Sequence, residues 1–160
     1  MIKVLFVCLG NICRSPMAEA FFRDLVEKEG LANQFIIDSA GIGAWHVGLP
    51  PHEGTRKMLD EKQISYHGMK ARQVSEADWQ EFDYIIAMDE QNIHDLEEIK
   101  KNAEGVKVAK LMDYVDAAKE RNVPDPYFTK KFDYTYQLVE SGCEALLKAI
   151  KQEKQIKGAL

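Results

Sequence analysis

Short apolar runs that are rich in β-branched side chains recur along the chain, and each of them is followed by polar or turn-forming residues. Runs of this length between turn signals are typical of strands buried inside a sheet. We expect four such strands, at residues 2–7, 35–37, 84–88 and 106–111.

Segments with apolar residues at helical spacing lie between and after these strands, at residues 16–29, about 52–62, 89–100 and about 133–154. Pro16 fits the first position of its helix, Gly30 fits the stop of that helix, and Asp89 fits the N-cap of another. This alternation predicts an α/β fold, a single doubly wound domain with a parallel sheet that binds ligands beyond the carboxyl ends of its strands. The longest irregular stretch, residues 116–131, is a candidate functional loop.

Length and charge narrow the possible functions. The chain has 160 residues, of which 46% are hydrophobic, so we expect one domain with a full core across residues 1–160. A net charge of -5 gives no positive field for DNA or RNA, and no nucleic-acid partner is expected. No apolar stretch reaches the roughly 18 to 20 residues of a membrane-spanning helix, so no membrane insertion is expected.

The cysteines and the first residues of the chain indicate in which cellular compartment the protein is expected. Cys8, Cys13 and Cys143 do not make the paired framework of a small secreted protein. The apolar start has one positive charge, Lys3, and no A-x-A-like cleavage site follows it. A cytoplasmic setting is therefore expected, although export without a leader would leave no trace. Cys143 lies inside the last expected helix, where a free cysteine packs as a small hydrophobe.

The segment between the first strand and the first helix carries candidate chemistry. Residues 7–20 read VCLGNICRSPMAEA, which places residues 8–15 in a loop at the carboxyl end of the sheet. Backbone N–H groups of such a loop, with the free donors of the following helix, form a concave anion site. Gly10 lets the backbone turn, and the planar fork of Arg14 can hold two oxygens of a phosphate. The loop is not a Walker A sequence.

A thiol in this position suggests nucleophilic catalysis. Cys8 would face the N–H dipoles and Arg14, which favours the reactive thiolate form and offsets its repulsion from a phosphate dianion. Ser15 can donate its hydroxyl to the Cys8 sulfur or cap the helix before Pro16, and the two roles are compatible. Cys13 either fills space under the loop or acts as a resolving thiol that traps oxidised Cys8 as a disulfide.

The letters C-L-G-N-I-C-R-S-P, which begin at Cys8, resemble the C-x5-R-[ST] signature of the low-molecular-weight protein tyrosine phosphatases. The segment Asp125-Pro126-Tyr127 is similar to the general-acid loop of that family and also precedes the last helix. Other segments resemble the family in the expected order, namely D-S-A at 38–40, A-R-Q at 71–73, F-D-Y at 82–84 and M-D-E at 88–90. The resemblance covers nearly the whole chain.

This resemblance implies a flavodoxin-like fold with a four-stranded parallel sheet, and metal-free hydrolysis of phosphomonoesters through a phosphocysteine intermediate. Cys8 would be the nucleophile, Arg14 the phosphate clamp, and Asp125 the general acid and then the base. Asn11 and Ser39 would form a hydrogen-bonded pair that supports the loop, together with Ser15. The phosphate would be bound by the whole loop, Leu9, Gly10, Asn11, Ile12, Cys13, Arg14 and Ser15.

The implied substrates are phosphotyrosine-containing proteins and small aryl phosphates. Trp45 and Tyr127 resemble the aromatic walls that sandwich the substrate ring, although packing on the loop surface would also explain either residue. The resemblance implies that no cofactor and no metal are needed, and the four histidines show no metal-ligand spacing. A monomer is expected.

The chain also departs from the family pattern. Met69 stands where many relatives have the histidine of an H-x-x-R-Q pattern, so the role of that histidine is not transferred to His67. Phe128 follows Tyr127, which leaves one hydroxyl where some relatives have a tandem tyrosine pair that can be phosphorylated. Regulation through Tyr127 is therefore a hypothesis.

Three other functions share parts of this pattern. Protein arginine phosphatases resemble this family but carry a threonine at the position of Ile12, and isoleucine favours an aryl phosphate. Thioredoxin-coupled arsenate reductases need further cysteines near the third strand, and residues 80–98 contain none. A phosphocarrier or a simple anion-binding protein needs neither Arg14 nor Asp125.

Overall fold

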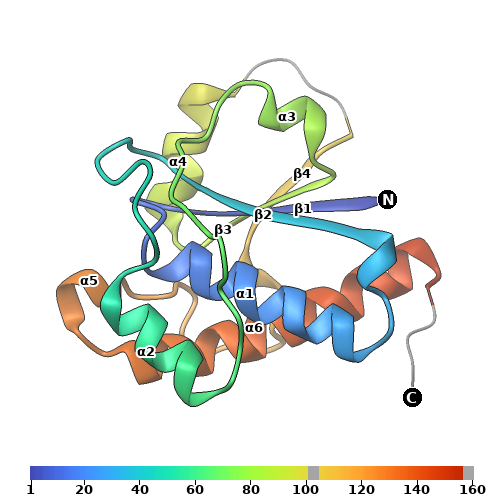
Figure 1. Ribbon diagram of the computed structural model, residues 1–160. Helices are drawn as coiled ribbons and strands as arrows, with labels where there is room; N and C mark the ends of the chain where they lie inside the picture. The colour runs from blue at the N-terminus through green and yellow to red at the C-terminus, as the bar shows by residue number, and fades with distance from the viewer. Residues whose placement is uncertain (101–104, 157–160) are drawn as a thin grey trace.

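Four parallel strands build the central sheet of the computed structural model, which describes residues 1–100 and 105–156 (Figure 1). They are β1 (Ile2–Cys8), β2 (Phe35–Gly41), β3 (Tyr84–Ala87) and β4 (Lys107–Lys110), in the spatial order β2-β1-β3-β4. The predicted α/β fold with a four-stranded parallel sheet is confirmed. β2 continues past the predicted end at residue 37, because it pairs with β1 along its whole length, from Phe35 beside Ile2 to Gly41 beside Cys8.

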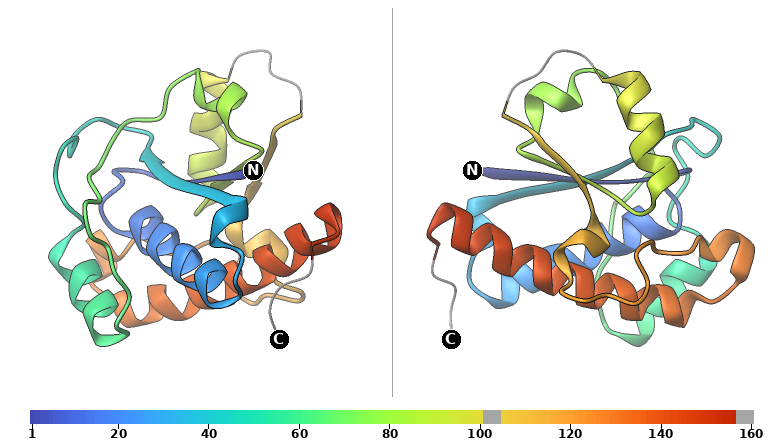
Figure 2. Two further views of the ribbon diagram at one scale, coloured as in Figure 1. Left: turned by 45° about the vertical axis from the view of Figure 1, so that its right-hand side comes forward. Right: turned by 180° about the vertical axis from the view of Figure 1, so that it is seen from behind.

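Helices cover both faces of this sheet. In the described residues they are α1 (Arg14–Lys28), α2 (Glu53–Glu61), α3 (Asp78–Glu81), α4 (Glu90–Ile99), α5 (Pro126–Thr129) and α6 (Phe132–Lys154), with 3-10 turns η1 (Ala32–Gln34) and η2 (Leu111–Tyr114). Figures 1 and 2 show α1 and α6 against one face and α3 and α4 on the other. Among the described helices none is long and apolar enough to cross a membrane.

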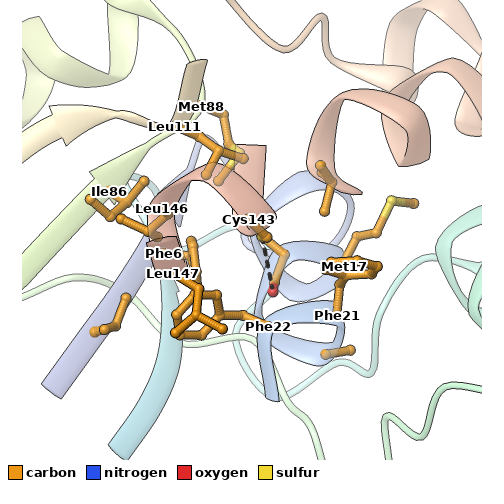
Figure 3. Close-up of a cluster of buried hydrophobic side chains, with 14 of the residues drawn as sticks. Phe6, Met17, Phe21, Phe22, Ile86, Met88, Leu111, Cys143, Leu146 and Leu147 are labelled. Atoms are coloured by element: carbon orange, nitrogen blue, oxygen red, sulfur yellow. Dashed lines mark hydrogen bonds between the residues drawn. The ribbon is translucent and has the colours of Figure 1, made fainter. Parts of the chain in front are cut away.

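The central strand β1 contributes side chains to two hydrophobic cores, one on each face of the sheet. Its side chains alternate between the two faces of the sheet, so Phe6 and Cys8 point toward α1 and α6 whereas Leu5 and Val7 point toward α3 and α4. In the first core, which Figure 3 shows, the rings of Phe6 and Phe22 meet edge to face with centroids 5.5 Å apart. Cys8 therefore ends a strand that is packed on both faces.

Cys143 lies in the same core on α6 and is 0% exposed. Its Sγ lies 3.9 Å from the carbonyl oxygen of Ala18 (Figure 3). Burial raises the pKa of this thiol well above its ordinary value. The prediction that Cys143 packs as a small buried residue is confirmed.

The start of α1 differs from the prediction. The helix begins at Arg14, so Pro16 occupies its third position and not its first. The residue before the helix, Cys13, makes no side-chain cap hydrogen bond. The predicted capping role of Ser15 is wrong, because Ser15 lies inside the first turn and its hydroxyl points to the loop. Gly30 stops the chain after the helix with a φ of 72°, as predicted.

Two short helices were not predicted. α3 and α5 have four residues each, and a single turn gives no apolar periodicity to read. α5 falls inside the predicted loop at residues 116–131. The predicted N-cap of α4 is confirmed, because Oδ1 of Asp89 accepts a hydrogen bond from Asn92 N at 2.8 Å.

Candidate active site

Residues 9–13 join β1 to α1 and form a loop with free N–H groups. Its carbonyl groups bind the surrounding backbone, since Leu9 O accepts from Gly43 N at 2.9 Å and Ile12 O accepts from His52 N at 2.7 Å. The backbone N–H groups of residues 9–13 donate no hydrogen bond to any described residue. A loop with free donors before a helix N-terminus is suited to bind an anion.

Gly41 and Gly10 have no side chain, and this allows close packing around the loop. A Cβ on Gly41, at the end of β2, would lie 2.9 Å from the carbonyl carbon of Gly10 and 3.0 Å from Asn11 N. A Cβ on Gly10 would lie 2.9 Å from the ring of His46. The left-handed residue of the loop is Asn11, with a φ of 58°. Gly10 is therefore needed for close packing, and not for a left-handed turn.

Arg14 is held by the protein before any ligand binds. It is 2% exposed, its Nη1 donates to Asp89 Oδ2 at 2.5 Å and to Val123 O at 2.9 Å, and its Nη2 donates to Asp125 Oδ2 at 3.3 Å. Burial lowers the pKa of the Arg14 guanidinium, but its interactions with Cys8, Asp125 and Asp89 outweigh burial and raise this pKa. The Nε of Arg14 has no partner among the described residues. A fixed cation with an unpaired donor suits an anionic ligand.

A hydrogen-bond chain connects the thiol to residues behind the loop. The Sγ of Cys8 lies 3.0 Å from Ser15 Oγ. The Nδ2 of Asn11 donates to Ser15 Oγ at 2.8 Å and to Ser39 Oγ at 2.9 Å, and Ser39 Oγ donates to Glu19 Oε1 at 2.6 Å. All five residues are buried. The structure thus brings together the predicted loop-supporting residues and adds a carboxylate to them.

A cavity of about 200 Å³ adjoins the loop. Its lining consists of Cys8, Leu9, Gly10, Ile12, Cys13, Trp45, His46, Asp125, Tyr127 and Phe128. The predicted nucleophile, general acid and aromatic walls therefore line one cavity, although they lie far apart in the sequence. The side chains of Asn11 and Ser15 are directed to the buried hydrogen-bond chain behind the loop.

Asp125 is positioned by α5 at the wall of this cavity. Its Oδ1 accepts a hydrogen bond from Tyr127 N at 3.0 Å and caps that one-turn helix, while its Oδ2 faces Arg14. The side chain of Asp125 is 18% exposed. Asp125 can therefore exchange a proton with a group bound in the cavity.

The two aromatic residues at the cavity rim are accessible. Tyr127 is 41% exposed and Trp45 is 69% exposed. Trp45 also packs on the backbone, because a Cβ on Gly43 would lie 1.9 Å from its ring. The ring of His46 lies 6.1 Å from that of Tyr127. Both predicted aromatic residues line the cavity.

Cys13 also lines the cavity, and its thiol has a shifted pKa. Burial, followed by the charges of Asp125 and Cys8, raises the pKa of Cys13 to about 12. Cys13 is therefore a neutral thiol at physiological pH. Both cysteines are free thiols.

Sequence reasoning missed four supporting residues, Glu19, Gly41, Arg72 and Asp89. The backbone N–H of Arg72 donates to Asn11 Oδ1 at 3.0 Å, while its guanidinium pairs with two carboxylates. Arg72 and Asp89 lie in segments that resemble the family, so the resemblance could have found them. Glu19 and Gly41 gave no such signal.

Comparison with known proteins places the chain in one family. Residues 3–156 match the family described as low molecular weight phosphotyrosine protein phosphatase. The chain is 56% identical to the low molecular weight protein-tyrosine-phosphatase YfkJ of Bacillus subtilis, over 98% of this chain and 100% of that protein. The crystal structure of YfkJ matches with a TM-score of 0.93 and covers 97% of this chain and 98% of that one.

Two further relatives are similar over almost their whole lengths. The low molecular weight protein-tyrosine-phosphatase PtpA of Staphylococcus epidermidis is 41% identical over 98% of this chain and 99% of that protein. A Drosophila protein described as an arginine phosphatase is 35% identical in its crystal structure, with a TM-score of 0.88 over 94% of this chain and 98% of that one.

Proposed function

This chain belongs to the low molecular weight phosphotyrosine protein phosphatase family, and on this basis we propose that it hydrolyses phosphotyrosine in proteins, and small aryl phosphates, through a phosphocysteine intermediate on Cys8. One observation carries the proposal. Cys8 ends a buried strand at a cavity whose loop has free N–H donors and whose buried arginine, Arg14, has an unpaired Nε. Such donors suit a phosphate dianion placed beside the thiol.

In the first step the Sγ of Cys8 attacks phosphorus. A sulfur–phosphorus bond forms while the bond from phosphorus to the phenolic oxygen breaks. The departing oxygen takes a proton from Asp125, which lines the same cavity. The loop N–H groups and Arg14 stabilise the charge on the transferred phosphoryl oxygens.

In the second step water attacks the phosphocysteine. The oxygen–phosphorus bond forms as the sulfur–phosphorus bond breaks, and the electron pair returns to the Sγ of Cys8. The Asp125 carboxylate accepts the proton of the attacking water. Since the loop and Arg14 supply the positive charge, the proposed mechanism uses neither a metal ion nor a cofactor.

The cavity wall favours an aromatic leaving group. Trp45 and Tyr127 can stack on a substrate ring, which is worth about 0.5–1.5 kcal/mol beyond the buried area. Ile12 lines the cavity with an aliphatic side chain and offers no hydrogen bond to a phosphoguanidinium. Because a Drosophila relative is described as an arginine phosphatase, phosphoarginine is the substrate to test against phosphotyrosine.

We further propose that the protein acts in the cytoplasm as a monomer. Three free thiols fit a reducing compartment. The proposed domain spans residues 1–160, of which 101–104 and 157–160 lie outside the described residues. A disulfide between Cys8 and Cys13 and phosphorylation of Tyr127 stay predictions.

The test measures phosphate release from phosphotyrosine and phosphoarginine peptides side by side in EDTA. Cys8→Ser is the blank, and Cys143→Ala is the matched control because it removes a thiol buried between α1 and α6. We expect release mainly from phosphotyrosine, unchanged in Cys143→Ala and lost in Cys8→Ser. Preference for phosphoarginine would replace the substrate and keep the mechanism. Release from neither peptide would favour a carrier or binding function.

A further inference from the structure

We propose that His52 is a positioning residue for the aromatic ring of the substrate, because its imidazole supports the Tyr127 side chain from outside the cavity. The inference rests on the proposed function, in which the substrate ring stacks on Tyr127. Among the described residues, those that line the cavity include Tyr127 but not His52. His52 would therefore act on the substrate through Tyr127 and not by direct contact.

The ring of Tyr127 depends on its neighbours for a fixed position, since Tyr127 is 41% exposed. Its centroid lies 5.9 Å from that of His52, and the two rings meet edge to face at an interplanar angle of 77°. Phe128 also meets it edge to face, at 5.2 Å, but is itself 70% exposed. His46 lies 6.1 Å away and lines the cavity beside Tyr127. His52 thus supports the ring from a side that the substrate does not occupy.

His52 is itself held by three separate segments. Its backbone N–H donates to Ile12 O of the phosphate loop at 2.7 Å. Its Nδ1 accepts a hydrogen bond from Gly54 N at 3.0 Å and caps the start of α2. Its ring stacks on that of Phe132, the first residue of α6, with centroids 5.2 Å apart and an interplanar angle of 19°. The imidazole therefore has a fixed place between the loop, α2 and α6.

Gly54 allows this stack to form. A Cβ on Gly54 would lie 2.5 Å from the ring of Phe132, so a side chain there would displace the ring on which His52 packs. Figures 1 and 2 show α2 and α5 side by side at one end of the molecule. The rings of Phe132, His52 and Tyr127 thus form a series that runs from the start of α6 to the cavity wall.

The neutral form of His52 suits this position. Burial, followed by the charge of Lys130, lowers the pKa of His52, and Glu53 opposes this shift. In the neutral imidazole the Nδ1 can accept from Gly54 N, which a protonated ring could not do. At neutral pH His52 therefore keeps its cap and both ring contacts together.

The consequence concerns the ring of the substrate and not its phosphate. The phosphate would be held by the loop and Arg14, whereas Tyr127 would contact the aromatic leaving group. Without the imidazole, the Tyr127 side chain could adopt other rotamers, and the stacked position would be less populated. The loss is limited to what the aromatic contact contributes, which is about 2- to 10-fold in affinity.

The experiment measures the binding of benzylphosphonate and methylphosphonate by isothermal titration calorimetry. Neither compound is hydrolysed, and they differ in the aromatic ring. The Kd of methylphosphonate divided by that of benzylphosphonate is the ring preference, which should exceed 1 in the wild-type protein. Equal Kd values in the wild-type protein would overturn the inference.

Two substitutions separate the ring of His52 from its cap. His52→Asn keeps an acceptor for the helix cap and removes the ring. It should lower the ring preference by about 2- to 10-fold and leave the Kd of methylphosphonate unchanged. His52→Phe keeps a ring, loses the cap acceptor and should retain the wild-type preference. An unchanged preference in His52→Asn, or an equal loss of affinity for both phosphonates, would overturn the inference.

Tyr127→Leu tests whether His52 acts through Tyr127. This substitution should lower the ring preference at least as much as His52→Asn does. Adding His52→Asn to Tyr127→Leu should then cause no further loss, because the ring that His52 supports is already absent. Multiplicative effects of the two substitutions would show that His52 acts by another route and would contradict the inference.

His94→Asn is the matched control. His94 lies on α4, where its side chain is 69% exposed and its Nε2 lies 3.9 Å from Glu90 Oε1. This variant removes a histidine ring in the same way as His52→Asn and should keep the wild-type ring preference. A loss as large as that in His52→Asn would argue against a specific role of His52.

Binding of the phosphonates does not depend on turnover, so the two proposals can fail separately. Absence of Cys8-dependent phosphate release in the wild-type protein would overturn the proposed function alone. An unchanged ring preference in His52→Asn, in a protein that still releases phosphate, would overturn the inference alone. If His52→Asn does not fold, His52→Ser, which also keeps a cap acceptor, carries the same comparison.

Discussion

Replacement of Asp125 by asparagine separates two functions of this side chain. Oδ1 of Asp125 caps α5 by accepting from Tyr127 N at 3.0 Å, and its carboxyl group can also carry a proton to the leaving group. Asparagine caps helices about as well as aspartate, whereas alanine costs about 0.5–2 kcal/mol at such a position. Asp125→Asn therefore keeps the cap and removes the acid, while Asp125→Ala removes both.

The substitution Asp125→Asn should change the position of Arg14 very little. The contact from Arg14 Nη2 to Asp125 Oδ2 is 3.3 Å long, and Arg14 keeps its bonds to Asp89 at 2.5 Å and to Val123 O at 2.9 Å. The clamp should thus stay in place, and the main loss is that of general acid catalysis. This loss is about 100- to 10,000-fold, or about 2.7–5.4 kcal/mol of transition-state stabilisation.

The assay is kcat for a series of aryl phosphates whose leaving groups differ in acidity. A poor leaving group needs the proton most, so the loss in Asp125→Asn should be largest for phosphotyrosine and smallest for p-nitrophenyl phosphate. Asp125→Ala should show the same kinetic pattern with a lower melting temperature. An equal loss for every leaving group, or a loss below about tenfold, would refute the reasoning that Asp125 donates a proton.

Three further predictions follow from packing and charge. Gly142→Ala should lower the free energy of unfolding by about 1–3 kcal/mol in urea titrations, because its Cβ would lie 2.4 Å from the Leu111 side chain; wild-type stability would contradict this. The Nδ1 of His52 caps α2, and burial, followed by the charge of Lys130, lowers the pKa of His52 below 6.5. Just below pH 6.5 the unfolded state therefore binds more protons than the folded state. Its contribution to stability should be complete above pH 6.5 and decline as the pH falls through the lowered pKa. His52→Asn should remove this part of the pH dependence of thermal melting, and identical pH profiles would argue against it. Iodoacetamide at neutral pH should modify Cys8 well before Cys13, whose pKa is raised to about 12, and peptide mapping that finds Cys13 modified first would reverse this order.

The elements that the sequence predicts well are those with a local cause. The β1 run is apolar throughout because both faces of a central strand are buried, and a run of this kind is visible without any knowledge of its neighbours. The end of β2 was missed for the opposite reason. Asp38 and Ser39 read as polar turn residues, but they pair with Leu5 and Phe6 of β1, which lies far away in the sequence.

The residues of the candidate site also fall into two groups, those that a local sequence pattern reveals and those that only the tertiary structure brings together. Cys8, Gly10 and Arg14 lie on one short segment, so their spacing alone indicated an anion site beside a thiol. Asp125 meets Arg14 across 111 positions, and Asp89 meets it across 75, which no local pattern records. The residues alone indicated the loop at 116–131 that contains Asp125, and the family resemblance singled out Asp125 within it.

Glu19 illustrates what a pattern cannot show. Its position on α1 gives no apolar or polar period that distinguishes it from an exposed helix carboxylate, yet it is 5% exposed. The reason is tertiary, because Ser39 on β2 supplies a hydrogen bond that makes the burial of its charge tolerable. Buried charges of this kind become visible only when the partner element is placed beside them.

The contacts that hold Arg14 also have a thermodynamic consequence for ligand binding. A free arginine side chain carries about 2 kcal/mol of rotamer entropy, which is lost when the side chain becomes fixed. In this fold the loss occurs when α1, α4 and the Asp125 segment assemble around the guanidinium, before any phosphate arrives. If binding itself had to order the side chain, affinity for phosphate would fall by about 30-fold. This entropy cost is therefore part of the free energy of folding, and phosphate binds to an arginine side chain that is already fixed.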